Sequence, residues 1–211
     1  MSLKGKISRS IPERWLHCPP NGNHLIVAKF MAFKTPLSEN YKVPPEFQYP
    51  PEKLFYLAKR NGVKIGLWID LTNTNRYYDK RVVEQEGCQY IKLKCIGHGG
   101  PPSVEKTKLF ISLVHEYIIK HPFDCIAVHC THGFNRTGFL IISFLIVQLG
   151  FDTAAALEVF AQSRPPGIYK QDYINELFRR YGNIKDVPVA PALPEWCEVE
   201  NHRRKRKSKK S

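Results

Sequence analysis

The stretch from residue 123 to residue 149 constrains the fold more than any other part of the chain. The apolar run FDCIAVHC (123–130) is followed by the short segment THGFNR (131–136), and then by a second apolar run that begins TGFLIISFLIV. The first run has the length of a buried strand and the second that of a buried helix. A tight turn between them would gather its N–H groups beside the positive end of the helix dipole. This pattern predicts an anion-binding cradle.

A cysteine stands at the base of the predicted cradle. The amides and the helix dipole would stabilise the Cys130 thiolate, and cysteines in such settings have pKa values of roughly 3.5–7.5. Arg136 presents a planar fork of donors that suits two phosphoryl oxygens. Gly133 would allow the turn, Thr137 would hydrogen-bond the sulfur, and His129 would orient the loop. The predicted cradle consists of Thr131, His132, Gly133, Phe134, Asn135 and Arg136.

The alternative to a catalytic cysteine is an inert one. A bare Cys-x5-Arg spacing arises by chance in about one in ten chains of this length, and most buried cysteines behave as small hydrophobic residues. The full context is much rarer, because a histidine precedes Cys130, a glycine stands three residues after it, and a threonine follows Arg136. The context therefore favours a thiolate nucleophile that attacks phosphorus.

Hydrophobic patterning predicts an α/β fold, with a central mixed, mostly parallel sheet flanked by helices and a ligand site at the carboxyl ends of the strands. In the helix from 103 to 120, Ser103 is the expected N-cap. Its expected buried face consists of Leu109, Phe110, Leu113, Val114, Tyr117 and Ile118. Further strands are expected at 64–71, 90–96 and 123–130, and further helices at 51–60, 136–149, 153–162 and 171–181. The helix at 136–149 is expected to end at Gly150 and the helix at 171–181 at Gly182.

Composition divides the chain into three parts. We expect a flexible basic N-terminus at 1–10, one catalytic domain at 11–183, and a Pro-rich linker with a basic tail at 184–211. The last eleven residues carry seven Lys or Arg and no acid, about half of the formal net charge of +13. This tail resembles a nuclear import signal or a nucleic-acid-binding arm, and a merely solvating tail is the alternative. The six cysteines show no metal-ligand spacing and suggest free thiols, and no apolar run is long enough to span a membrane.

The segment HCTHGFNRT is similar to the H-C-x-x-G-x-x-R-[S/T] signature of cysteine-dependent protein tyrosine and dual-specificity phosphatases. The resemblance implies a dual-specificity-phosphatase-like fold and a two-step reaction through a phosphocysteine. It implies that Cys130 is the nucleophile, that Arg136 clamps the phosphate, and that residues 131–136 form the amide cradle.

Family members that act on phosphoproteins usually carry an aspartic acid on a loop about thirty residues before the cysteine. The corresponding segment here, CIGHGGPPS (95–103), contains no acid, and its titratable side chains are Cys95 and His98. An alkoxide leaving group needs a proton in the transition state. A phosphate leaving group does not, because its second pKa is about 6. The missing acid therefore favours cleavage of a phosphoanhydride, unless the acid lies elsewhere or the chain is a crippled phosphatase.

Longer motifs resemble the RNA triphosphatase domains of animal mRNA capping enzymes: IPERWLHCP, FKTPL, GLWIDLTNTNRYYD and SRPPGIYKQDYINELFRRYG. The resemblance implies removal of the γ-phosphate from 5′-triphosphate RNA without metal or other cofactor. With the basic tail as an import signal, we expect this activity in the nucleus. The K-x-D-G motif of the companion guanylyltransferase domain is absent, and a contact with the phosphorylated RNA polymerase II tail would need such a domain. Alternatives are a polyphosphatase that also removes the β-phosphate, a non-catalytic module that binds phosphate ends, and a protein phosphatase.

Other polar residues are supporting candidates. Asp70 ends the strand WIDL and is expected either at the rim of the site, ordering the cradle or serving late as a base, or as a residue that caps the following loop. Arg164 and Lys170 flank PPGIY and are expected to contact the β- or α-phosphates, unless that loop is only solvated. Lys34 and Lys94 are weaker candidates of the same kind.

Overall fold

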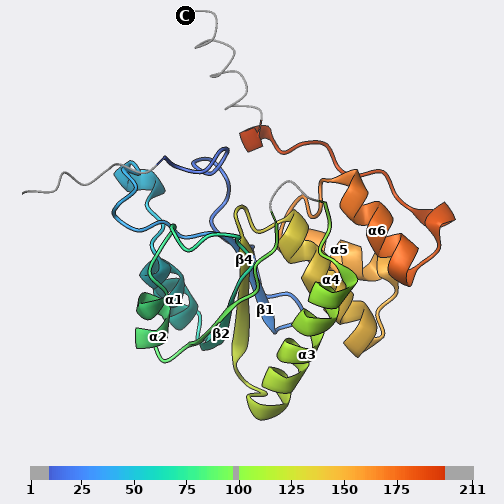
Figure 1. Cartoon of the computed structure of the whole chain (residues 1–211), viewed down its shortest axis with the longest axis horizontal. Helices are drawn as coiled ribbons and strands as arrows, with labels where there is room; N and C mark the ends of the chain where they lie inside the picture. The colour runs from blue at the N-terminus through green and yellow to red at the C-terminus, as the bar shows by residue number, and fades with distance from the viewer. Residues whose placement is uncertain (1–9, 97–99, 198–211) are drawn as a thin grey trace, which may run out of the picture.

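Four parallel strands form the sheet at the centre of the computed structural model, which describes residues 10–96 and 100–197 (Figure 1). The strands lie in the order β1-β4-β2-β3. Every pairing between them is parallel, so the mixed sheet that we allowed for is not seen among these strands; the antiparallel pairings in the described ranges are two isolated bridges. The strand bounds are Phe30–Lys34 (β1), Ile65–Asp70 (β2), Gln89–Lys92 (β3) and Cys125–Cys130 (β4).

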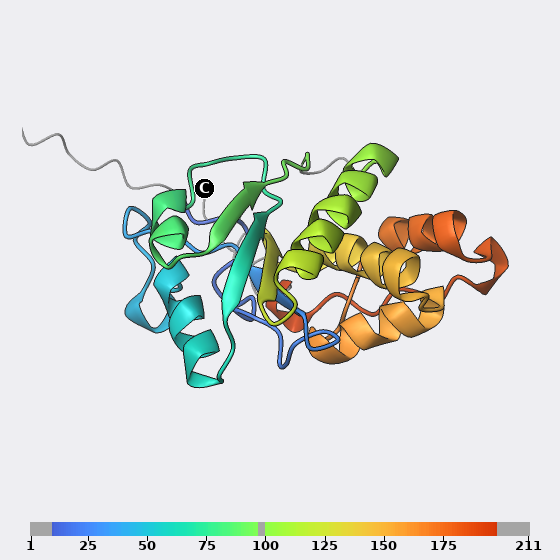
Figure 2. The same ribbon diagram turned by 90° about the horizontal axis from the view of Figure 1, so that it is seen from below.

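Helices cover both faces of the sheet, as the two views in Figures 1 and 2 show. One face carries α1 (Pro51–Arg60) and α2 (Lys80–Gln85), and the other carries α3 (Val104–Lys120), α4 (Asn135–Leu149), α5 (Thr153–Ser163) and α6 (Gln171–Tyr181). Two 3-10 turns, η1 (Pro45–Phe47) and η2 (Ile184–Asp186), lie in the connections. Each face of the sheet buries its own apolar cluster. The predicted α/β class is confirmed, and no helix in the described ranges is long and apolar enough to cross a membrane.

The helix boundaries follow the local signals in the sequence. The Ser103 hydroxyl accepts a hydrogen bond from the Lys106 amide at 3.3 Å and caps α3. Helix α4 ends at Gly150, whose φ of +69° is the left-handed conformation that favours glycine. One residue of the predicted α3 face is wrong: the Leu109 side chain is 49 % exposed. The helix instead buries Thr107, Phe110, Ile111, Val114 and Tyr117, because this stripe faces α4 and the sheet.

Strand β1 was not predicted, because it is short and follows an irregular segment. It pairs with β4 so that Lys34 lies opposite Cys130. The chain before it is anchored by Trp15, whose indole N–H donates to the Thr35 carbonyl at 2.7 Å. All six cysteines are free thiols, as expected.

The chain beyond the predicted domain end at residue 183 packs against the loop that follows β4. Residues 187–194 run without regular structure, and a short turn then places the Trp196 ring 5.5 Å from the rings of both His132 and Phe134. Cys197 is fully buried. The residues up to 197 therefore pack against the same body as the sheet. Residues 1–9 of the N-terminus predicted to be flexible (1–10), and residues 198–211, which hold the predicted basic tail, lie outside the described residues.

Gly66 in β2 gives a test of the packing beneath the sheet. A Cβ added there would overlap the Tyr117 hydroxyl and the Asp124 carboxylate. We expect Gly66→Ala to lower the free energy of unfolding by about 2 kcal/mol, measured by urea denaturation. Lys64→Ala is the control, because the Lys64 ammonium contacts Asp124 from a side chain that is 73 % exposed, and exposed ion pairs contribute about 1 kcal/mol or less. An equal loss of unfolding free energy in both variants would contradict the close packing of Gly66 against Tyr117 and Asp124.

Candidate active site

The connection between β4 and α4 forms a tight loop around the Cys130 sulfur. Cys130 is the last residue of β4 and is 4 % exposed. Helix α4 begins five residues later, at Asn135. Gly133 adopts φ +76° and its amide donates to the Cys130 sulfur at 3.3 Å. A side chain at Gly133 would overlap the Phe33 carbonyl of β1, so the close approach of β1 and the positive φ both require glycine here.

The pKa of the Cys130 thiol is lowered from its ordinary value. Burial acts in the opposite direction and is the largest single effect, because it disfavours the charged thiolate. The positive charge of Arg136, the Thr137 hydroxyl and the backbone amides of Gly133 and His132 together outweigh it. The loop therefore holds a nucleophilic thiolate in a buried position, and no separate base is needed to generate it.

The remaining cradle residues fix the loop from several sides. The Thr131 hydroxyl accepts from the Arg136 guanidinium at 3.3 Å. The His132 ring contacts the Glu13 carbonyl through Nε2 at 2.8 Å, and burial lowers its pKa to about 4. The Phe134 ring is fully buried beneath the loop. The Asn135 carboxamide accepts from the amides of residues 169 and 170, both at 3.1 Å. The side chains of these residues thus brace the cradle, and the backbone is left to bind the anion.

Arg136 lies at the mouth of the loop, in the first turn of α4. Its guanidinium donates to the Cys95 carbonyl at 3.2 Å and to the Thr131 hydroxyl at 3.3 Å. Arginine carries five N–H donors, so these two contacts hold the guanidinium in place and leave other donors available for an anion. The side chain is only partly buried and lines the cavity above Cys130. This placement suits the predicted phosphate clamp.

His129 links the loop to a buried polar network. Its Nδ1 donates to the Cys130 carbonyl at 3.0 Å, and its Nε2 accepts from the Tyr78 hydroxyl at 2.6 Å. This assignment of the ring protons is the one that satisfies both partners. The ring is fully buried, and burial lowers the pKa of His129. A neutral ring locked between two partners matches the predicted loop-orienting role and does not serve as a base.

Asp70 lies within the network and not at the rim, which corrects that part of the prediction. It is 2 % exposed. Its oxygens accept from the Thr72 amide at 2.8 Å, the Tyr90 hydroxyl at 2.9 Å and the Lys92 ammonium at 2.8 Å. Burial acts to raise its pKa, but the positive charge of Lys92 and the hydrogen bonds from Lys92 and Thr72 outweigh it, so the net pKa is lowered and the group is ionised. Asp70 therefore caps the following loop and orders His129, and its carboxylate has no free access to the thiolate.

Arg164 is a second correction, because it does not face the phosphate site. It is 1 % exposed. It donates to the His132 carbonyl at 2.9 Å, to the Pro19 carbonyl at 2.8 Å and to the Gly133 carbonyl at 3.4 Å. By drawing the loop carbonyls toward itself, Arg164 leaves the loop amides pointing the other way, toward Cys130. It is a positioning residue beneath the cradle and does not contact β- or α-phosphates.

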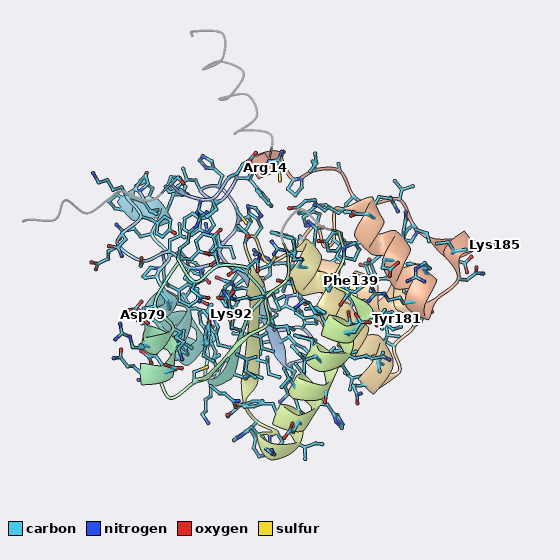
Figure 3. All side chains as sticks on the ribbon, in the orientation of Figure 1. Arg14, Asp79, Lys92, Phe139, Tyr181 and Lys185 are labelled. Atoms are coloured by element: carbon cyan, nitrogen blue, oxygen red, sulfur yellow. The ribbon has the colours of Figure 1, made fainter. Side chains whose placement is uncertain are left out.

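A cavity of about 670 Å³ opens above the cradle. Cys130, Arg136 and Lys170 line it, so Lys170 faces the site as predicted. Two further cations in the lining, Arg14 and Arg76, were missed. They stand in IPERW and NTNRY, which the sequence ties to this site only through its family resemblance. Figure 3 shows Arg14 above the carboxyl end of the sheet.

The weaker candidates fall outside this cavity. The Lys34 ammonium donates to the carbonyls of Trp15 and Cys18, at 3.0 and 2.9 Å, and is buried. Lys94 is exposed and is not part of the cavity wall. His98 and its two glycine neighbours lie outside the described residues. Within residues 10–96 and 100–197, no group of three or more His, Cys, Asp or Glu side chains is placed to hold a metal ion.

Comparison with known proteins agrees with this geometry. The family model of the dual specificity phosphatase catalytic domain matches residues 48–182. An mRNA-capping enzyme of Danio rerio is 51 % identical over 90 % of this chain and 32 % of its own length. An RNA/RNP complex-1-interacting phosphatase of Rattus norvegicus is 38 % identical over 84 % of this chain and 55 % of its own. The chain thus spans about a third of the first relative and about half of the second.

Solved structures share the same fold. A crystal structure of Tk-PTP covers 81 % of this chain and 99 % of its own, with a TM-score of 0.59 and 16 % sequence identity. At that level of identity the likeness supports the fold alone. It supports no particular substrate.

The role of Arg136 in forming the thiolate can be measured by alkylation. Because the Arg136 charge lowers the Cys130 pKa, we expect Arg136→Ala to raise it. The pH midpoint for alkylation of Cys130 by iodoacetamide should then move upward and the rate at neutral pH should fall, with the labelled residue located by mass spectrometry. Arg136→Lys keeps a cation and should retain most of the wild-type profile. An unchanged midpoint in Arg136→Ala would contradict the electrostatic account.

Proposed function

The chain belongs to the dual specificity phosphatase catalytic-domain family, and we propose that it removes the γ-phosphate from the 5′-triphosphate end of RNA, leaving a 5′-diphosphate end. The observation that carries this proposal is a thiolate-forming cysteine inside an amide cradle, on a loop that faces several cations. The high identity with an mRNA-capping enzyme over nearly the whole chain supports RNA as the substrate.

In the proposed first step, the Cys130 thiolate attacks the γ-phosphorus. The S–P bond forms, the bond between the γ-phosphorus and the bridging oxygen breaks, and the diphosphate end of the RNA leaves with the electron pair. The loop amides and the Arg136 fork would bind the γ-oxygens as charge shifts in the transition state. Because these donors are fixed before the substrate arrives, little reorganisation accompanies the reaction.

In the proposed second step, water attacks the phosphocysteine, the S–P bond breaks, and inorganic phosphate and the thiolate are released. Thr137 is suited to this step. Its hydroxyl is buried and has no hydrogen-bond partner within the described chain, yet it favours the thiolate form of Cys130. We infer that the Thr137 hydroxyl donates to the departing sulfur.

The proposed substrate also accounts for the missing acid. The segment that would carry a general acid has no Asp or Glu at any of residues 95–103. Two of its carbonyls are used to position other groups: Cys95 accepts from Arg136, and Gly100 accepts from the Tyr173 hydroxyl at 2.7 Å. A diphosphate leaving group ionises near neutral pH and needs no proton from the protein. An alkoxide leaving group from a phosphoprotein would need one.

We further propose that this activity serves mRNA 5′ capping in the nucleus. The mRNA-capping enzyme among the relatives supports the process, and the basic run at the end of the sequence supports nuclear import. In this proposal a guanylyltransferase domain acts on the diphosphate product. Any contact with the phosphorylated tail of RNA polymerase II is assigned to that domain and not to this chain.

RNA labelled separately at the γ- and β-phosphates tests the proposed reaction. In the presence of EDTA we expect release of the γ-label and retention of the β-label. Cys130→Ala should reduce γ-release by about a thousandfold or more, since it removes the nucleophile. Cys125→Ala is the matched control, because Cys125 is a buried thiol at the opposite end of the same strand, and it should remain active.

The same assay separates the other possibilities. Release of both labels would identify a polyphosphatase and overturn the diphosphate product. Loss of all activity in EDTA would overturn the metal-free mechanism. Turnover of phosphopeptides at a comparable rate would overturn the argument from the missing acid.

A further inference from the structure

A second cavity adjoins the one above Cys130. It has a volume of about 470 Å³ and lies between the β2–α2 loop, the end of β3 and the segment around residue 40. Thr74, Arg76 and Tyr77 line both cavities. An extended ligand that is bound in the first cavity and crosses these shared residues therefore reaches the second cavity. In Figure 3, Lys92 and Asp79, which line the second cavity, lie on the α1–α2 side of the sheet.

The two cavities differ in charge. The first is lined by four cations, Arg14, Arg76, Arg136 and Lys170, against the single acid Glu13. In the second, Lys92 is paired with Asp70 at 2.8 Å and Lys80 with Glu84 at 2.8 Å, and Asp79 contacts the neighbouring Arg81. The first cavity therefore suits phosphates, whereas the second offers little net charge to attract further phosphates.

The lining of the second cavity suits a flat ring with hydrogen-bonding edges. Tyr77 and Tyr90 supply aromatic surface, on which a base can stack. Asn40 and Asn75 supply carboxamides, and neither carboxamide makes a hydrogen bond to another residue of the described chain. Each carboxamide offers two donors and an acceptor, which is the pattern that reads the edge of a base.

The wall between the cavities is held in place by the surrounding chain. The Tyr41 hydroxyl donates to the Arg76 carbonyl at 3.0 Å, and the Ser38 amide donates to the Tyr77 carbonyl at 2.9 Å. On the floor, the Tyr90 hydroxyl and the Lys92 ammonium both donate to Asp70. The cavity is thus formed before any ligand binds, which reduces the entropy that binding costs.

We infer that the second cavity is a subsite for the first nucleoside of the RNA, placed so that the triphosphate crosses the shared wall between it and the cradle. Arg76, on that wall, then lies beside the β- and α-phosphates. This inference depends on the proposed function for its substrate, but it adds that the enzyme recognises the base and ribose as well as the phosphates. A substrate without a nucleoside would leave the second cavity empty.

A cavity-filling variant tests the subsite. Asn40 is exposed and lines only the second cavity, so Asn40→Trp should block the subsite and leave the cradle intact. We expect the KM for γ-phosphate release from 5′-triphosphate RNA to rise about tenfold, the size expected for the loss of one stacked base. Release of phosphate from inorganic triphosphate, which has no nucleoside, should be unchanged and shows that the variant is folded.

Asn23→Trp is the matched control. Asn23 is an exposed asparagine that lines neither cavity, and its replacement should leave both substrates unaffected. Equal kinetics of Asn40→Trp and wild type on RNA would overturn the subsite. An equal loss on both substrates would also overturn it, because the effect would then come from the shared wall. Failure of the wild type to hydrolyse RNA at all, by contrast, would refute the proposed function.

RNA whose first residue lacks its base completes the comparison. With wild type, the abasic substrate should show about the same rise in KM as Asn40→Trp shows with ordinary RNA. With Asn40→Trp, the missing base should cause little further loss, because the two changes remove one interaction. Additive losses would mean that the base binds elsewhere, for instance beside Lys170, and would overturn the assignment.

Discussion

The hydrogen bond from the Gly133 amide to the Cys130 sulfur is the interaction on which the rest of the site depends. It forms only if the chain turns sharply between β4 and α4, and that turn needs a glycine, because β1 lies directly against it. The loop carbonyls then point away from the sulfur, and Arg164 and His129 donate the hydrogen bonds that hold them there. The sheet order, with β4 between β1 and β2, brings these supports to one place.

The arrangement separates cations by what they contact. Arg164 is buried and satisfied by carbonyls, so its charge positions the loop and stabilises the thiolate from below. Arg136 stands at the mouth, partly buried and only partly satisfied. Lys170 and Arg76 are exposed at the edges of the cavity. The cationic side chains are therefore more exposed to solvent the farther they lie from the base of the cradle. This is the path that a chain of phosphates would follow.

Local sequence signals predicted the helices and turns well, but they did not predict which charged side chains are buried. The turn around Gly133, the cap at Ser103 and the ends of the long helices depend on neighbours in sequence, so the sequence alone indicated them. The β1 strand and the exposure of Leu109 depend on packing between distant segments. For the same reason Arg164 was wrongly predicted to bind phosphate. Its Pro-rich loop suggests an exposed side chain, and only the tertiary structure shows the three carbonyls that surround it.

Trapping of the covalent intermediate tests the central claim most directly. RNA labelled at the γ-phosphate would be mixed with the enzyme and quenched in acid during the first turnover, and the labelled peptide would be identified by mass spectrometry. The account predicts one phosphate on Cys130, formed as fast as the diphosphate RNA appears and absent from Cys130→Ser. Formation of diphosphate RNA with no phosphate on the protein at any time would show that water attacks the RNA directly, and would contradict the thiolate mechanism.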